Sequence, residues 1–132
     1  MKLARELVLF GVVGVIGFLV DSGVLYLFKS AMGLYYGRLL SFFCAVVTTW
    51  LLNRHLTFKQ RASGLSVIHE FSRYFGLMLG GGVVNYSSYA LLVYFLDFFA
   101  SQPIWGVAAG SCAGMVVNYL SARFLVFRNK AN

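Results

Sequence analysis

Charged residues are sparse in four long stretches of the chain and gather between these stretches and at both ends. The apolar stretches run over Leu7–Phe28, from Leu39 to about Phe58, over Tyr74–Leu96, and from Ile104 to about Phe124. A helix needs about 20 mostly apolar residues to cross the hydrocarbon core of a bilayer. The pattern therefore predicts an all-α integral membrane protein with four transmembrane helices.

The composition argues against a soluble protein. Hydrophobic residues make up 60% of the 132 positions and charged residues 11%, whereas soluble domains carry about 25% charged residues. This length accommodates a single transmembrane domain over 1–132 and no separate catalytic domain. The sequence contains no phosphate-cradling glycine loop, metal-ligand spacing or nucleophile triad. We therefore expect no enzyme activity, no cofactor and no metal site.

Positive charges lie mostly on one side of the predicted membrane. Nine of the 11 Lys and Arg residues lie before the first stretch, between the second and third, or after the fourth: Lys2, Arg5, Arg54, Lys59, Arg61, Arg73, Arg123, Arg128 and Lys130. Lys29 and Arg38 fall in the other two connections. Under the positive-inside rule, both termini and the middle connection are cytoplasmic. The membrane also explains the net charge of +7, so nucleic acid is not an expected partner.

The two halves of the chain resemble each other. Three early matches lie 64 residues apart: Glu6–Phe10 with Glu70–Tyr74, Gly17 with Gly81, and Asp21 with Asn85. A later match, Thr49–Phe58 with Asn118–Phe127, lies 69 residues apart, which indicates a longer connection between the third and fourth helices. We therefore expect two duplicated helical hairpins, over about 5–60 and about 69–129. Because each has an even number of spans, both point the same way across the membrane.

Asp21 and Asn85 are polar residues at matching depths inside the membrane. A carboxylate there costs several kcal/mol unless it is protonated, paired or hydrated, so it marks a candidate site. Together the two side chains would flank a hydrated headgroup path. The alternative is a protonated Asp21 that hydrogen-bonds to Asn85 or to a backbone carbonyl.

Arg54 and Arg123 occupy matching cytoplasmic ends of the second and fourth helices. A guanidinium offers a planar fork that suits phosphate oxygens, so the pair would bind a phosphodiester between the repeats. Lys59 and Arg128, each five residues further on, would widen this basic mouth. The alternative is ordinary snorkelling and positive-inside anchoring.

Smaller polar residues lie within about a turn of the two arginines. These residues would form hydrogen bonds with a lipid headgroup, or alternatively form hydrogen bonds between helices. They are Asn53, Thr49, Asn118 and Ser121. Glu6 and Glu70 begin the first and third helices, where negative charge is favourable. A role for these two glutamates in positioning the arginines is a second interpretation.

Small residues predict where helices pack closely. Gly106, Gly110 and Gly114 form a repeated small-xxx-small pattern. We expect similar contacts at Gly14 and Gly17 and at Gly80–Gly82. The face of Gly106 to Gly114 is also a candidate contact for a homodimer, with packing inside one protomer as the alternative.

Three stretches of the chain resemble the GtrA family of small, duplicated, four-span bacterial membrane proteins. They are Phe10–Asp21, Asn53–Phe58 and Asn118–Phe127. The likeness covers nearly the whole chain. It departs from the family pattern at Gly17, where members often carry Asn, and at Leu9, where they often carry a basic residue.

The resemblance implies a role in cell-surface polysaccharide or glycolipid modification at the bacterial cytoplasmic (inner) membrane. Members are thought to move monosaccharides linked to a polyprenyl phosphate, such as undecaprenyl phosphate, from the cytoplasmic to the outer leaflet. The expected partners are this sugar lipid, membrane lipid and an outward-facing glycosyltransferase. In this role the Arg54 and Arg123 mouth would capture the phosphate.

Two other functions stay open at this point. One is a membrane adaptor that holds a glycosyltransferase and moves nothing itself, in which case Arg54, Arg123 and Asp21 would tolerate substitution. The other is a small proton-coupled exporter of cations, for which Asp21 supplies an acid in the first helix. The basic mouth argues against the exporter, because it would repel cations at the entrance.

Overall fold

The computed structural model describes residues 2–130, except for the side chains at positions 34, 35, 38, 103, 107 and 130. The expected charges of Arg38 and Lys130 therefore lie outside the described side chains. The chain divides into two compact units. We call them hairpin 1, which runs to Val67 and includes Asn129 and Lys130, and hairpin 2, which is Ile68–Arg128.

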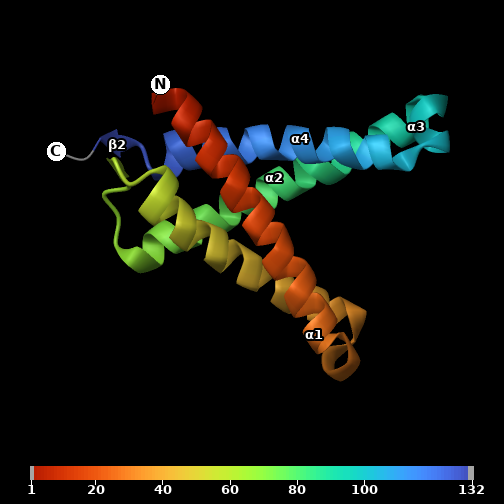
Figure 1. Cartoon of the computed structure of the whole chain (residues 1–132), viewed down its shortest axis with the longest axis horizontal. Coiled ribbons are helices and arrows are strands. Elements are labelled where there is room, and N and C mark those ends of the chain that lie inside the picture. Colours follow the sequence, from red (N-terminus) through yellow and green to blue (C-terminus); the bar gives the residue numbers. More distant parts are fainter. Residues whose placement is uncertain (1, 131–132) are drawn as a thin grey trace. The chain divides into compact units, whose positions relative to one another are not determined.

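Hairpin 1 is formed by α1 (Lys2–Leu52), which folds back on itself at Gly33 (Figure 1). Gly33 has a φ of 78°, a left-handed conformation that glycine adopts without a side-chain penalty. The first arm of α1 is Lys2–Gly33, and the second arm runs from Leu39 into the π-helical turn η1 (Asn53–Thr57). After η1 the chain enters the short strand β1 (Arg61–Ala62).

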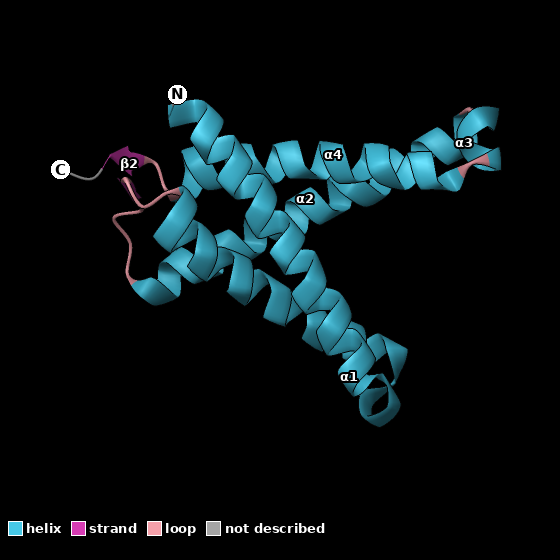
Figure 2. Cartoon of the chain, viewed as in Figure 1, coloured by secondary structure: helices cyan, strands magenta, loops and turns pink. Residues whose placement is uncertain are grey.

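Hairpin 2 contains all of α2 (Val67–Phe95) except its first residue, the short helix α3 (Asp97–Ser101) and α4 (Pro103–Ser121) (Figure 2). Pro103 occupies the start of α4, where its missing N–H costs nothing. α4 continues into a second π-helical turn, η2 (Ala122–Val126). The connection that contains α3 is the one in which the spacing between matching residues changes from 64 to 69.

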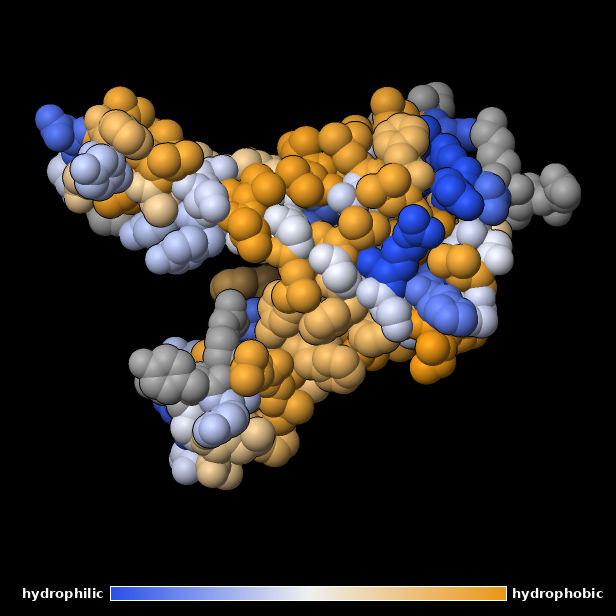
Figure 3. Space-filling model, turned by 180° about the vertical axis from the view of Figure 1, so that it is seen from behind, coloured by the Kyte–Doolittle hydropathy of each residue, from blue (hydrophilic) through white to orange (hydrophobic). Residues whose placement is uncertain are grey.

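The four predicted helices are confirmed. Within residues 2–130, four helices are long and apolar enough to cross a membrane: Lys2–Gly33, Leu39–Thr57, Val67–Phe95 and Ile104–Val126. Apolar side chains cover most of the surface that Figure 3 shows, as expected for helices that face lipid. The first helix extends beyond its apolar stretch at both ends, and the third helix begins at Val67, before its apolar stretch starts.

Glycines bring the two helices of each hairpin into close contact. Gly17 lies against the Thr49 side chain in hairpin 1, and Gly81 lies against the Asn118 side chain in hairpin 2. The two contacts correspond to each other, because Gly17 matches Gly81 and Thr49 matches Asn118 in the sequence repeat. Gly14, Gly80 and Gly82 have open space beside them, so the expectation of close contact at these three positions is wrong.

The glycines of α4 pack on α2. A methyl group placed on Gly110 would lie 2.5 Å from the backbone oxygen of Asn85, and one placed on Gly106 would lie 3.1 Å from the Tyr89 ring. On Gly114 it would lie 2.9 Å from the backbone oxygen of Gly81. This face is therefore occupied inside hairpin 2, and its assignment as a dimer contact is wrong. A homodimer through another surface stays a prediction, as do the repeat boundaries and the parallel orientation of the repeats.

Gly110→Ala is expected to destabilise the protein by about 1–3 kcal/mol, because the new methyl group would push against backbone that has nowhere to move. The matched control is Gly82→Ala, since Gly82 has no neighbour in its path. The measurement is the free energy of unfolding in detergent micelles. Equal stability of the two variants would contradict this packing.

Candidate functional site

Each hairpin ends its second helix in a π-helical turn at matching positions. The backbone N–H of Phe58 donates to the carbonyl oxygen of Asn53 at 2.8 Å, and that of Phe127 donates to the carbonyl oxygen of Ala122 at 2.8 Å. Such turns are rare and are frequently found at functional sites. Here the wider turn lies directly at Arg54 in hairpin 1 and at Arg123 in hairpin 2.

A buried aromatic residue anchors each π-helical turn to the first helix of its hairpin. Phe58 is 0% exposed and meets Phe10 edge to face, with ring centroids 6.3 Å apart. Phe127 is 1% exposed and meets Tyr74 in the same way at 6.5 Å. Edge-to-face pairs of this kind add to the stabilisation from burial. The aromatic residue four positions after each arginine is therefore a packing anchor that fixes the end of the helix.

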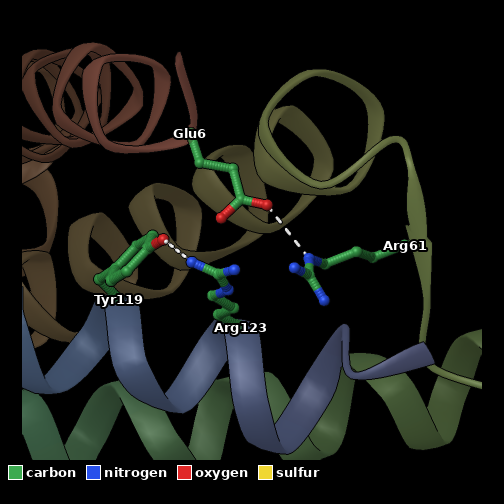
Figure 4. A network of polar contacts seen from close by, with 4 residues as sticks. All are labelled: Glu6, Arg61, Tyr119 and Arg123. Carbon is green, nitrogen blue, oxygen red and sulfur yellow. Dashed lines mark hydrogen bonds and ion pairs between the residues drawn. The ribbon is translucent and has the colours of Figure 1, made fainter. Parts of the chain in front are cut away.

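Both arginines lie against an aromatic residue one turn earlier. The Arg54 guanidinium lies 5.9 Å from the centre of the Trp50 ring. Arg123 donates a hydrogen bond from Nη1 to the hydroxyl of Tyr119 at 2.9 Å (Figure 4). Trp50 and Tyr119 are matching residues of the two repeats. Both arginines are half-buried, and the Nε atom of Arg123 is fully buried. Each guanidinium is therefore oriented by contacts within its own hairpin.

Asn53 lies inside hairpin 1 and stabilises the π-helical turn. It is 1% exposed, and its Oδ1 accepts a 2.8 Å hydrogen bond from the hydroxyl of Thr57, which is 2% exposed. The matching residues in hairpin 2 are Ala122 and Val126, which are also buried. The position of this hydrogen-bonded pair is thus taken by two apolar residues in the other repeat. A contact of Asn53 with a lipid headgroup stays a prediction.

The other predicted headgroup residues have different surroundings. Thr49 donates from Oγ1 to the carbonyl oxygen of Val46 at 3.1 Å. Ser121 is half-buried, and Lys59 and Arg128 are exposed. Among the described residues, the Oδ1 atom of Asn118 is buried without a hydrogen-bond donor, and it lies against Gly81. The structure therefore leaves Lys59 and Arg128 accessible and places Thr49 and Asn118 in helix contacts.

Asp21 and Asn85 lie at matching positions of the two hairpins. Both are half-buried. The backbone and side chain of Asn85 pack on Gly110 and Gly114 of α4. A path between Asp21 and Asn85 stays a prediction.

The ion pair of Glu6 and Arg61 adds a residue that the sequence did not single out. The Arg61 Nε atom donates to Oε1 of Glu6 at 3.1 Å, and the two side chains are 16% and 13% exposed (Figure 4). Arg61 lies in β1, which pairs antiparallel with β2 (Asn129–Lys130). The pair ties the start of the first arm to the strand that follows η1. The signal available in the sequence was the matching glutamates, of which Glu70 is also buried.

The family model for the GtrA/DPMS transmembrane domain matches residues 9–129. The chain belongs to this family. It is a multi-pass membrane protein with an all-α fold, and its family fits a role in the handling of sugar-linked lipids. Neither the curated proteins nor the solved structures gave a match. Within residues 2–130, no three His, Cys, Asp or Glu residues are grouped so that they would hold a metal ion.

Thr57→Val is expected to lower the free energy of unfolding by about 1–3 kcal/mol, because the buried Asn53 oxygen loses a donor. Valine fits sterically, since the matching residue of the other repeat is Val126. Thr57→Ser keeps the hydroxyl and is the control. Unfolding in detergent micelles measures both, and a serine variant as unstable as the valine variant would contradict the role of the hydrogen bond.

Proposed function

We propose that this protein translocates a monosaccharide linked to polyprenyl phosphate from the cytoplasmic to the outer leaflet of the bacterial inner membrane. The sugar then serves a glycosyltransferase that modifies a cell-surface polysaccharide or glycolipid. Membership of the GtrA/DPMS family supports the substrate class. The mechanism rests on the two arginine-bearing turns.

The observation that carries the proposal is the repetition of one local structure at both helix ends. In each hairpin an arginine lies at a π-helical turn, next to an aromatic residue one turn earlier and before a buried phenylalanine. Snorkelling alone requires a flexible cation at the interface and no such support. A guanidinium group whose orientation is fixed can donate two hydrogen bonds to two oxygens of a phosphate. The phosphate is the one charged group of the proposed lipid.

The tail and the sugar of the lipid would cross the membrane in different surroundings. The polyprenyl tail stays in the hydrocarbon, so its transfer costs little, whereas the sugar hydroxyls lose water and need polar partners on the way. Asp21 and Asn85 supply such groups in the first helix of each hairpin. In each hairpin the arginine, Arg54 or Arg123, would capture the phosphate at the cytoplasmic side, together with the exposed Lys59 or Arg128 five residues further along the chain.

The test is leaflet exchange in liposomes that contain the purified protein and an undecaprenyl-phosphate hexose. Membrane-impermeant periodate reports how fast the sugar becomes accessible. The wild type is expected to exchange the lipid faster than empty liposomes. Loss of a charged hydrogen bond costs about 1.5–3 kcal/mol, so Arg54→Gln and Arg123→Gln are each expected to slow exchange by about ten-fold or more.

Arg54→Lys and Arg123→Lys are the matched controls, because they keep the charge and remove the fork. Slower exchange in the lysine variants, with unchanged thermal stability, would support recognition of phosphate by the planar group. Full activity of the Gln variants would rule out the proposed phosphate contacts. An inactive wild type across glucose, galactose and mannose lipids would favour a membrane adaptor for a glycosyltransferase.

A further inference from the structure

Five consecutive residues that can form hydrogen bonds interrupt the apolar sequence of α2. They are Asn85, Tyr86, Ser87, Ser88 and Tyr89. At about 1.5 Å per residue, Tyr86 lies roughly 20 Å along the helix from Arg73, in a hydrocarbon core about 30 Å thick. This run is therefore deep in the membrane, where polar side chains are costly and usually serve a function.

The run divides into two faces of the helix. Asn85 and Tyr89 are one turn apart, and both pack on glycines of α4, at Gly110 and Gly106. Tyr86 and Ser87 follow Asn85 by about 100° and 200° around the helix axis, so Tyr86 lies to one side of the face that contacts α4 and Ser87 lies opposite that face. Tyr86 is 73% exposed and Ser87 is also exposed.

The hydroxyls of Tyr86 and Ser87 have no hydrogen bond within the described part of the chain. Leaving a hydroxyl without a hydrogen bond in an apolar medium costs several kcal/mol. An apolar residue at either position would avoid this cost. The presence of both hydroxyls is therefore explained most simply if a polar ligand binds to this face for part of the time.

The matching residues of hairpin 1 are Ser22 and Gly23. Neither of these two residues carries an aromatic ring, whereas hairpin 2 offers a ring and two hydroxyls on adjacent positions. A tyrosine presents an apolar ring face together with a polar hydroxyl. A pyranose has the complementary chemistry, because it combines an apolar C–H face with hydroxyls around its edge.

We propose that Tyr86 and Ser87 bind the monosaccharide of the transported lipid, with the Tyr86 ring stacked on the sugar and both hydroxyls bonded to its edge. This proposal rests on the proposed function and adds the residues that distinguish a sugar-bearing lipid from a bare polyprenyl phosphate. The two repeats then differ in role: α2 of hairpin 2 recognises the sugar, and the arginine-bearing turns recognise the phosphate.

The test compares the binding of two probes to the full-length protein in detergent micelles. One probe is undecaprenyl phosphate, and the other is whichever of its glucose, galactose and mannose conjugates binds the wild type most tightly. Tyr86→Leu is expected to weaken binding of the conjugate by about ten-fold or more, through the lost stacking and hydrogen bond. Binding of undecaprenyl phosphate is expected to stay unchanged.

Tyr86→Phe keeps the ring and Ser87→Ala removes the second hydroxyl, and each is expected to cause part of the loss. The control is Tyr94→Leu, because Tyr94 is 82% exposed on the same helix but lies two turns further on. It is expected to change neither affinity. These comparisons separate sugar recognition from a general effect on α2.

Equal weakening of both probes by Tyr86→Leu, with a lower melting temperature, would overturn the proposal and indicate that this face packs against another helix. Unchanged binding of the conjugate would also overturn it while leaving the phosphate contacts intact. If the wild type bound neither probe, the proposed function itself would fail together with this inference.

Discussion

The close approach of two helices at glycine is the contact on which the rest of the structure depends. Helices in lipid gain little from the hydrophobic effect, because lipid tails are as apolar as their own side chains. Dispersion between closely packed atoms must hold each hairpin together. Gly17 against Thr49, and Gly81 against Asn118, provide this approach in the two hairpins. They also fix the register in which each second helix meets its first.

That register brings the aromatic anchors together at the end of each hairpin. Phe58 reaches Phe10, and Phe127 reaches Tyr74, so the helix end is held while its last turn widens. The same geometry arises from a buried Asn–Thr pair in one repeat and from Ala and Val in the other. The two repeats thus share the backbone conformation of the turn although different side chains support it, and in both repeats the second residue of the turn is an arginine.

Helix number, helix pairing and the matching arginines were predictable because they depend on local apolar length and on repeated residues. The π-helical turns were not, since they differ from an α-helix by a shift of one residue in a backbone hydrogen bond and leave no mark in the composition. The pair of Glu6 and Arg61 joins residues far apart in the chain and needed the fold. The burial of Asn53 and its hydrogen bond from Thr57 also needed the fold, because the sequence alone places Asn53 only within a turn of Arg54.

Recognition of a lipid phosphate by the arginine-bearing turns is the step on which the proposed function depends. The most direct measurement compares the binding of undecaprenyl phosphate and the neutral alcohol undecaprenol to the protein in nanodiscs, at increasing salt concentration. We expect saturable binding of the phosphate lipid that weakens as salt screens its charge, together with little binding of the alcohol. Equal affinity for the two lipids, independent of salt, would contradict it.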